Sequence, residues 1–195
     1  MFKIYSQNNV IKKYLKFRIF NTINVFGAYV TLLNKNETIK LSKKTKRAFK
    51  KINILKKDDF SKKININSKS KSSLQIILNH QNFVEKKIIL SIKNVKFDFN
   101  TISIFCADFV GMSAVNILKK NKFYVKSVYD DDLIFVGQEI SNIPIQSLPK
   151  NKFKSKNLRK VLAIVCHFDK RVFRNISKKL IKKGFLKKQI LQINY

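Results

Sequence analysis

The sequence predicts an α/β domain built on a mixed sheet, with basic extensions at both ends. A strand pattern, a helix pattern and a second strand pattern follow one another within residues 101–129. Strand, helix and strand in this order form a right-handed crossover, so at least part of the sheet is expected to be parallel. Hydrophobic residues make up 45% of the 195 residues, which is enough material for one packed core.

The first part of the chain contains an arm, two strand patterns, a basic stretch and a helix pattern. Residues 1–20 are basic and aromatic. The β-branched and aromatic run 25–33 predicts a buried strand, and the alternation over 38–42 predicts a returning strand. Residues 43–71 are the most basic and least periodic, and predict an inserted loop that orders on a polyanion. Apolar residues spaced by three and four over 74–92 predict a helix.

The crossover unit is the clearest pattern in the sequence. Residues 101–106 alternate between apolar and polar, as a half-buried strand does. Ser113 is a suitable N-cap for a helix that continues through Lys119. Residues 123–129 return as a second strand and end in three aspartates.

The last part of the chain predicts a linker followed by one small unit. Both prolines, Pro144 and Pro149, lie in a segment that continues into a lysine-rich stretch. A short apolar run occupies 161–166, and a helix with Phe173, Ile176 and Leu180 on one face is expected over 169–183. Gly184 stands where a helix C-cap belongs, and a strand-like tail follows.

These patterns divide the chain into three parts. Residues 1–20 form a basic N-terminal arm, and residues 21–145 form the α/β domain, with residues 43–71 as a basic insertion within it. Residues 146–195 form a basic C-terminal extension with one helix.

The charge predicts a polyanionic partner. Lysine and arginine number 42 against 11 aspartates and glutamates, which gives a formal net charge of +31. A compact domain with this charge repels itself strongly unless a polyanion neutralises it. Nucleic acid is favoured over a membrane, because the basic residues run along most of the chain and no apolar stretch is long enough to span a bilayer.

The composition also predicts an organellar origin. Only five of the 42 basic residues are arginine, tryptophan is absent, and isoleucine and asparagine are abundant. Amino acids with A- and T-rich codons are thus favoured, as in the genomes of organelles and reduced parasites. The N-terminus has neither a secretory pattern nor a good import signal. We therefore expect the protein to be made inside the organelle that uses it, in the mitochondrial matrix.

The stretch 110–130 resembles the small-subunit ribosomal protein called "eleven" in the universal nomenclature. The residues that fall in register without a gap are Ser113, Val115, Leu118, Phe123, Val125, Val128 and Asp130. A second match is 29–34, which is similar to a strand and turn of that family. A looser third match joins Ile143, Pro144 and Ile145 to the lysine-rich stretch from Lys150, and it requires an insertion after Asp132.

The sequence also departs from this family. Its loop of alternating glycine and proline is replaced by residues 107–111, which keep one glycine. A loop that approaches RNA closely through glycine backbone has thereby lost most of that ability. The basic stretch 43–71 replaces a glycine-rich segment, and residues 161–195 have no counterpart.

The resemblance implies the ribonuclease H-like topology of this ribosomal family and a place on the platform of the small subunit. The function then expected is structural and non-enzymatic. The chain would be a ribonucleoprotein component of the translation machinery that binds and stabilises rRNA beside neighbouring ribosomal proteins in a mitochondrial ribosome. Three alternatives stay open: a large-subunit protein of the "eighteen" family, a lineage-specific mitoribosomal protein, and a nucleic-acid enzyme such as a diverged nuclease.

The residues expected to bind RNA lie in the two densest basic clusters and in the C-terminal helix. Lysines neutralise phosphates and release condensed counterions, so binding is expected to weaken steeply with salt. The expected RNA-binding residues are Lys43, Lys44, Lys46, Arg47, Lys50, Lys51, Lys150, Lys152, Lys154, Lys156, Arg159, Lys160, Arg171 and Arg174.

Two short motifs invite a catalytic or metal-binding interpretation. Cys166 and His167 are adjacent, but two cysteines and two histidines in the whole chain are too few for a standard zinc site. The aspartates 130–132 are interpreted as a strand-end turn in which one of them pairs with a nearby lysine. The sequence therefore predicts no catalytic residue, no metal, no cofactor, no membrane contact and no small-molecule substrate.

Overall fold

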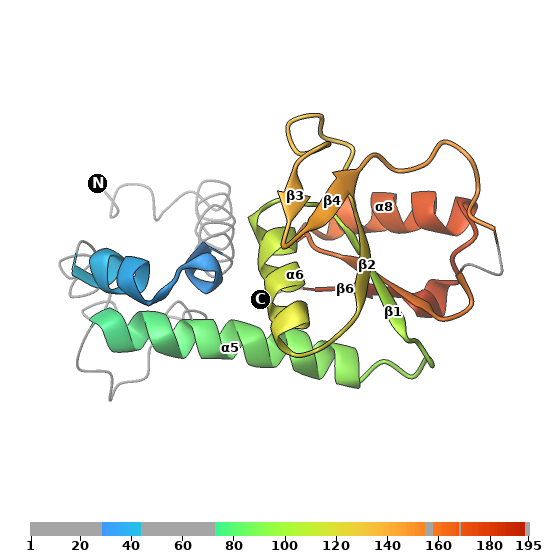
Figure 1. Cartoon of the computed structure of the whole chain (residues 1–195). Coiled ribbons are helices and arrows are strands. Elements are labelled where there is room, and N and C mark those ends of the chain that lie inside the picture. The colour runs from blue at the N-terminus through green and yellow to red at the C-terminus, as the bar shows by residue number, and fades with distance from the viewer. Residues whose placement is uncertain (1–28, 44–72, 155–157, 168, 194–195) are drawn as a thin grey trace, which may run out of the picture.

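The structure, a computed structural model, describes residues 29–43, 73–154, 158–167 and 169–193. They form a sheet with helices on both faces (Figure 1). The strands are β1 (Thr101–Phe105), β2 (Val125–Tyr129), β3 (Glu139–Ile140), β4 (Ile143–Gln146), β5 (Val161–Val165) and β6 (Ile190–Gln192). The helices are α5 (Ser73–Lys93), α6 (Phe109–Lys120) and α8 (Lys170–Lys182), with the 3₁₀ turn η1 (Lys187–Gln189) before β6.

The sheet is mostly parallel and has the strand order β3-β4-β2-β1-β5-β6. β1 pairs in parallel with both β2 and β5, β2 with β4, and β5 with β6, whereas β3 is antiparallel to β4. Counted along the chain, the parallel strands lie in the order 3-2-1-4-5, which is the arrangement of a doubly wound, Rossmann-like sheet. The predicted α/β class is confirmed, including the parallel crossover through α6. The ribosomal topology implied by the resemblance is not confirmed.

The core is divided between the two faces of the sheet. Along β5, Leu162 and Ile164 pack with the side chains of α5 and α6, while Ala163 and Val165 pack with Leu180 of α8. All five β5 residues are buried. A central parallel strand is covered on both faces, which explains why its sequence is an uninterrupted apolar run.

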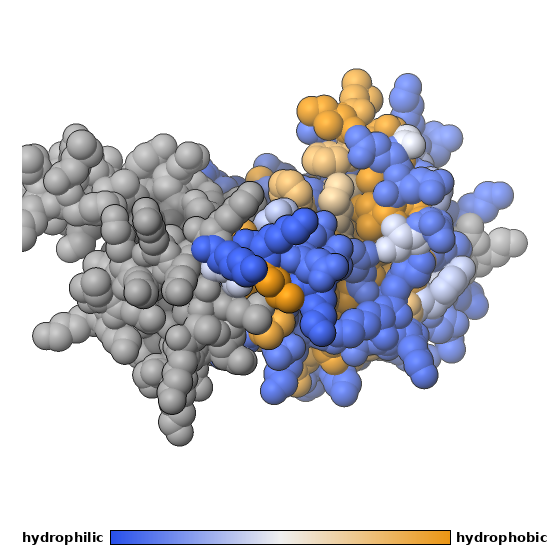
Figure 2. Space-filling view, turned by 60° about the vertical axis from the view of Figure 1, so that its left-hand side comes forward, coloured by the Kyte–Doolittle hydropathy of each residue, from blue (hydrophilic) through white to orange (hydrophobic). Residues whose placement is uncertain are grey.

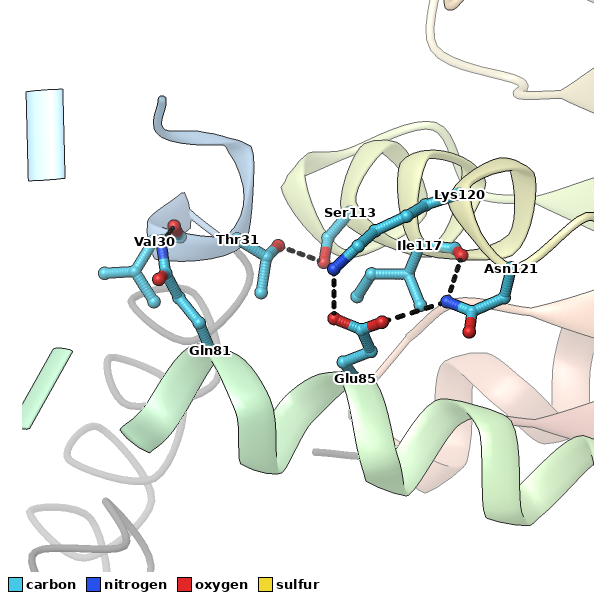
Figure 3. A network of polar contacts seen from close by, with 8 residues as sticks. All are labelled: Val30, Thr31, Gln81, Glu85, Ser113, Ile117, Lys120 and Asn121. Atoms are coloured by element: carbon cyan, nitrogen blue, oxygen red, sulfur yellow. Dashed lines mark hydrogen bonds and ion pairs between the residues drawn. The ribbon is translucent and has the colours of Figure 1, made fainter. Parts of the chain in front are cut away.

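The N-terminal described residues lie against α5 and α6 through polar contacts (Figure 3). The side-chain amide of Gln81 on α5 donates to the carbonyl oxygen of Val30. The hydroxyls of Thr31 and Ser113 are 2.5 Å apart. Glu85 joins α5 to α6, since its carboxylate accepts from Lys120 at 2.8 Å and from Asn121 at 3.0 Å.

Glu85 is expected to contribute pH-dependent stability. The hydrogen bond from Lys120, and then that from Asn121, lowers the pKa of Glu85 below its ordinary value of 4.5. A lowered pKa stabilises the fold above that ordinary value, and the contribution is lost as the pH falls through the folded-state pKa. Glu85→Gln should therefore lower the free energy of unfolding by less than about 1 kcal/mol at neutral pH, because the pair is partly solvated. Urea titrations at several pH values, with exposed Glu139→Gln as the control, should show the difference from wild type shrinking at acid pH. A difference that does not change with pH would contradict this assignment.

Two predicted strands near the N-terminus are wrong. Residues 29–32 and 35–43 are helical, and residues 25–28 lie outside the described part of the chain. A reciprocal capping box starts the second helix: the Glu37 N–H donates to the Asn34 side chain at 3.0 Å, and the Asn34 N–H donates to the Glu37 carboxylate at 2.9 Å. Two satisfied N-terminal donors outweigh the strand preference of the apolar run. The arm 1–20 and the insertion beyond Lys43 also lie outside the described residues.

The predicted C-terminal extension is part of the sheet. β5 lies between β1 and β6, so residues 161–192 complete the domain rather than follow it. The predicted linker contains β4, where Pro144 is paired with the edge strand β3. Such a position near a sheet edge tolerates proline. The expected helix over 169–183 is confirmed, as is its glycine C-cap, since Gly184 has a φ of +108°.

One face of the described part is mainly polar. Figure 2 shows a largely hydrophilic face with a small group of apolar side chains at its upper end, where the loop between β2 and β3 projects. Leu133 and Ile134 in that loop are 83% and 70% exposed. No helix within the described ranges is long and apolar enough to cross a membrane.

Candidate functional site

The carboxyl ends of β1, β2 and β5 meet at one edge of the sheet. The N–H of Cys106, after β1, donates to the carbonyl oxygen of Tyr129 at 3.0 Å, and the N–H of Cys166, after β5, donates to that of Phe105 at 2.9 Å. The connection after β1 leads through α6 toward β2, whereas the connection after β5 leads through α8 toward β6, in the opposite direction along the sheet. In open α/β sheets this topological switch point is the usual place for a ligand.

The turn from β1 into α6 is built on one close approach. A Cβ atom on Gly111 would lie 1.9 Å from the carbonyl oxygen of Cys106, so only glycine fits. Cys106 itself has a φ of +73°. Cys106, Asp108 and Gly111 have the spacing of the three glycines in a dinucleotide-binding turn, but only the third is a glycine.

The backbone donors of this turn are already occupied by carboxylates. Asp108 is the N-cap of α6, and its Oδ1 accepts from the N–H groups of Val110 at 2.9 Å and Gly111 at 3.2 Å. Asp130 Oδ2 accepts from the N–H of Ala107 at 2.5 Å. Burial raises the pKa of Asp108, while the bonds from Gly111 and Val110 act in the opposite direction.

The aspartates after β2 each have a structural partner. Besides its bond to Ala107, Asp130 accepts from the N–H of Asp132 at 2.8 Å, and Asp132 accepts from the N–H of Ile134 at 3.0 Å. Asp131 forms an ion pair with Lys179 of α8 at 2.9 Å. The prediction of a strand-end turn with one aspartate paired to a lysine is confirmed.

A cavity of about 330 Å³ lies between this edge of the sheet and helix α8. Apolar and aromatic side chains form its inner part, and the acidic side chains after β2 stand at its rim. Its lining includes Phe105, Tyr129, Asp130, Asp131, Leu148 and Ile176. The sequence did not predict this cavity.

The two cysteines at this edge are not arranged for chemistry. Burial raises the pKa of Cys106 to about 12 and that of Cys166 well above its ordinary value. Both thiols are therefore protonated at neutral pH, whereas nucleophiles and metal ligands are thiolates. Nδ1 of His167 accepts from the N–H of Asp169 at 3.0 Å. In the part of the chain that the structure describes, no three side chains of His, Cys, Asp or Glu gather as a metal site.

Helix α8 carries a second feature, a stripe of cations on its outer face. Lys170, Arg174, Lys178 and Lys182 follow one another at spacings of four residues, and all are exposed. The sequence of α8 contains no acidic residue. The inner face holds Phe173, Ile176 and Leu180 against the sheet, as predicted. We call the four exposed cations Lys170, Arg174, Lys178 and Lys182 the α8 stripe.

The segment 149–154 lies beside the C-terminal end of α8. The N–H of Phe153 donates to the carbonyl oxygen of Lys183 at 3.1 Å, and Nζ of Lys183 donates to that of Lys150 at 3.0 Å. The exposed Lys150, Lys152 and Lys154 thus extend the basic surface beyond the helix.

The structure brings together part of the predicted binding set. Arg171 and Arg174 lie on α8, and Lys150, Lys152 and Lys154 lie beside its end. Arg159 and Lys160 are exposed at the start of β5, at the opposite edge of the sheet, where Lys160 pairs with Asp98 at 3.2 Å. Lys43 is exposed at the end of the helix 35–43. Lys44, Lys46, Arg47, Lys50, Lys51 and Lys156 lie outside the described residues.

Three residues of the α8 stripe were missing from the predicted set, namely Lys170, Lys178 and Lys182. Together with Arg174 they are spaced by four residues, a pattern that was visible in the sequence once a helix had been assigned.

Comparison with known proteins gives structural likeness only. No family model matches the chain, and no curated protein matches it. A crystal structure of RSP in complex with β-NADH is similar, with a TM-score of 0.39, 15% identity and coverage of 91% of this chain and 86% of that chain. RSP described as a Rex-family repressor has a TM-score of 0.36, 13% identity and coverage of 91% and 86%. RSP in complex with β-NAD⁺ and operator DNA has a TM-score of 0.36, 13% identity and coverage of 92% and 85%.

These findings correct the predicted function. All three are structures of RSP, a Rex-family repressor; one is in complex with β-NADH and one with β-NAD⁺ and operator DNA, and none is described as a ribosomal protein. The segment that the ribosomal resemblance matches to a strand, 29–34, is helical over 29–32. The assignments to a ribosome, to rRNA and ribosomal proteins as partners, and to mitochondrial translation are therefore withdrawn. So is the expectation that no small molecule binds. The location of the protein stays a prediction.

A dinucleotide does not fit the turn between β1 and α6. Rossmann-type sheets hold the pyrophosphate on the free N–H groups at the start of this helix. Here the carboxylates of Asp108 and Asp130 take the N–H groups of Ala107, Val110 and Gly111. A phosphate at this position would find those N–H groups already hydrogen-bonded, and the two carboxylates would repel it.

Proposed function

We propose that the chain is a non-enzymatic DNA-binding protein that contacts the duplex backbone through the α8 stripe. The observation that carries this proposal is four exposed cations in one row on a helix that has no acidic residue. Like charges four residues apart destabilise a helix by about 0.2–0.5 kcal/mol per pair. Phosphates bound along the row would neutralise these charges and relieve the repulsion between them. The formal charge of +31 adds a general attraction for a polyanion.

The shape of the surface favours duplex DNA over duplex RNA. A helix of 13 residues is about 20 Å long. The major groove of B-DNA, about 12 Å wide, admits an α-helix and places phosphates on both sides of it. The major groove of A-form RNA is too deep and narrow for side chains to enter. The likeness to the repressor structures is too weak to add to this argument.

The contacts expected are mainly to phosphates. Lysine is a point charge that neutralises a phosphate without reading a base. Lys150, Lys152 and Lys154 continue the basic surface, so six or more phosphate contacts are available. Binding should accordingly depend weakly on sequence and strongly on salt.

Binding of a labelled DNA duplex by the full chain tests this function. With six contacts, the affinity should fall about 10³-fold between about 50 and 200 mM salt. A duplex RNA of the same length and sequence should bind more weakly at every salt concentration. Salt-independent binding, or preference for the RNA duplex, would refute the proposal.

A further inference from the structure

The cavity between helix α8 and the carboxyl edge of the sheet is lined by residues of α8 other than those of the stripe. Val172, Ile176 and Lys179 of α8 line it from one side, and Phe105 and Tyr129 line it from the sheet. None of the lining residues belongs to the α8 stripe, so the cavity and the DNA contact can be tested with separate variants.

The inner part of the cavity suits a flat apolar ring. Phe105 and Tyr129 are stacked with their centroids 5.2 Å apart, and Leu148 and Ile176 are half-buried beside them. A volume of about 330 Å³ lies at the lower end of the range for small-molecule sites, about 300–1,000 Å³. One ring system with a small polar group fills such a space, whereas two linked nucleotides exceed it.

The rim of the cavity carries two carboxylates, which accept hydrogen bonds, and one ammonium group, that of Lys179. Asp130 and Asp131 both reach it. Asp130 accepts two backbone N–H bonds, and a carboxylate has about four acceptor positions, so it retains capacity for ligand hydroxyls. Asp131 is held by Lys179 at 2.9 Å. A ligand here donates hydroxyl or amino hydrogens to the carboxylates.

The adjacent helix start offers nothing to a phosphate. Asp108 supplies the negative charge that a bound phosphate provides in a dinucleotide site, on the N–H groups of Val110 and Gly111. The cavity thus keeps the acidic group after β2, which suits a ribose, but lacks the donors that suit a pyrophosphate.

We propose that this cavity binds an unphosphorylated nucleoside, with the base against Tyr129 and Phe105 and the ribose hydroxyls at the carboxylates of Asp130 and Asp131. The Asp108 carboxylate makes the site selective against nucleotides.

Calorimetric titration of the full chain with adenosine and with ADP tests this proposal. Adenosine should bind, and ADP should bind at least about tenfold more weakly. In Asp108→Asn the amide still caps the helix, but one negative charge is removed. The preference for adenosine over ADP should therefore decrease, which a purely structural role for Asp108 would not produce.

Two further variants locate the site. Leu148→Trp fills the cavity and should abolish adenosine binding, while Leu133→Trp, in the exposed loop, should leave it unchanged. Asp131→Asn, at an exposed position, should weaken binding several-fold without unfolding the chain, so the test stands even if Leu148→Trp fails to fold. Absence of adenosine binding, ADP binding as tight as adenosine binding, or an unaffected Asp131→Asn variant would each overturn the proposal.

Discussion

Replacing Lys170, Arg174 and Lys178 together with glutamine should weaken DNA binding by about 10- to 100-fold at about 0.1 M salt. Each of these residues is exposed on the outer face of α8, and each substitution removes one expected phosphate contact. The three positions do not contribute to the core of the sheet, so the variant should keep its fold. Fluorescence anisotropy with a labelled duplex measures the effect directly.

The matched control is a triple variant on another surface. Lys86 and Lys93 on α5 and Lys96 after it are also exposed, and their change to glutamine alters the net charge by the same amount. This control should bind DNA within a few-fold of wild type. An equal loss in the two triple variants would mean that the overall charge, rather than the α8 stripe, holds the DNA.

Among the glycines that the structure describes, Gly111 is the one whose replacement by alanine should lower the free energy of unfolding most. The new Cβ would lie 1.9 Å from the carbonyl oxygen of Cys106, which is backbone and cannot rotate away. The helix α6 would have to shift from β1, where Ala114, Val115 and Leu118 are fully buried. We expect the free energy of unfolding to fall by about 3 kcal/mol or more.

Gly137→Ala separates the close approach from the backbone effect. Outside the adjacent residues no atom lies within 4 Å of a Cβ at this position, but its φ of +89° is unfavourable for alanine. The expected loss is about 1 kcal/mol. Urea denaturation of both variants compares them directly, and a loss at Gly111 no larger than that at Gly137 would contradict the tight contact between α6 and β1.

The elements with long, regular patterns could be predicted from the sequence. Helices α5 and α8 show apolar residues spaced by three and four, and residues 101–129 show a strand, helix and strand pattern. Both patterns are local, because they involve residues close together in the sequence. The start of α6 was placed too late, at Ser113 rather than Asp108, because either residue type can cap a helix. Ser113 is instead buried within α6.

The elements that were missed depend on distant partners or on a cap. β5 was assigned to an extension because its five apolar residues do not reveal that their neighbour is β1, about sixty positions earlier. Residues 38–42, which lie within the helix 35–43, were predicted to form a strand after a turn, although Asn34 and Glu37 have the spacing of a capping box. That signal was present in the sequence.

The ribosomal resemblance rested on a pattern that many folds share. Residues 110–130 do form a helix and a strand, so the in-register positions describe a crossover unit correctly. Such a unit occurs in numerous α/β proteins with unrelated functions. The cavity had no local signal, since its lining comes from β1, β2, the segment after β4 and α8.

The salt dependence of DNA binding tests the role of the α8 stripe most directly. The slope of log K against log salt counts phosphate contacts, at about 0.9 for each contact on B-DNA. The triple variant of Lys170, Arg174 and Lys178 should have a slope shallower than wild type by about 2.7, while the α5 control keeps the wild-type slope. Equal slopes for wild type and the α8 variant would show that these residues do not contact the duplex.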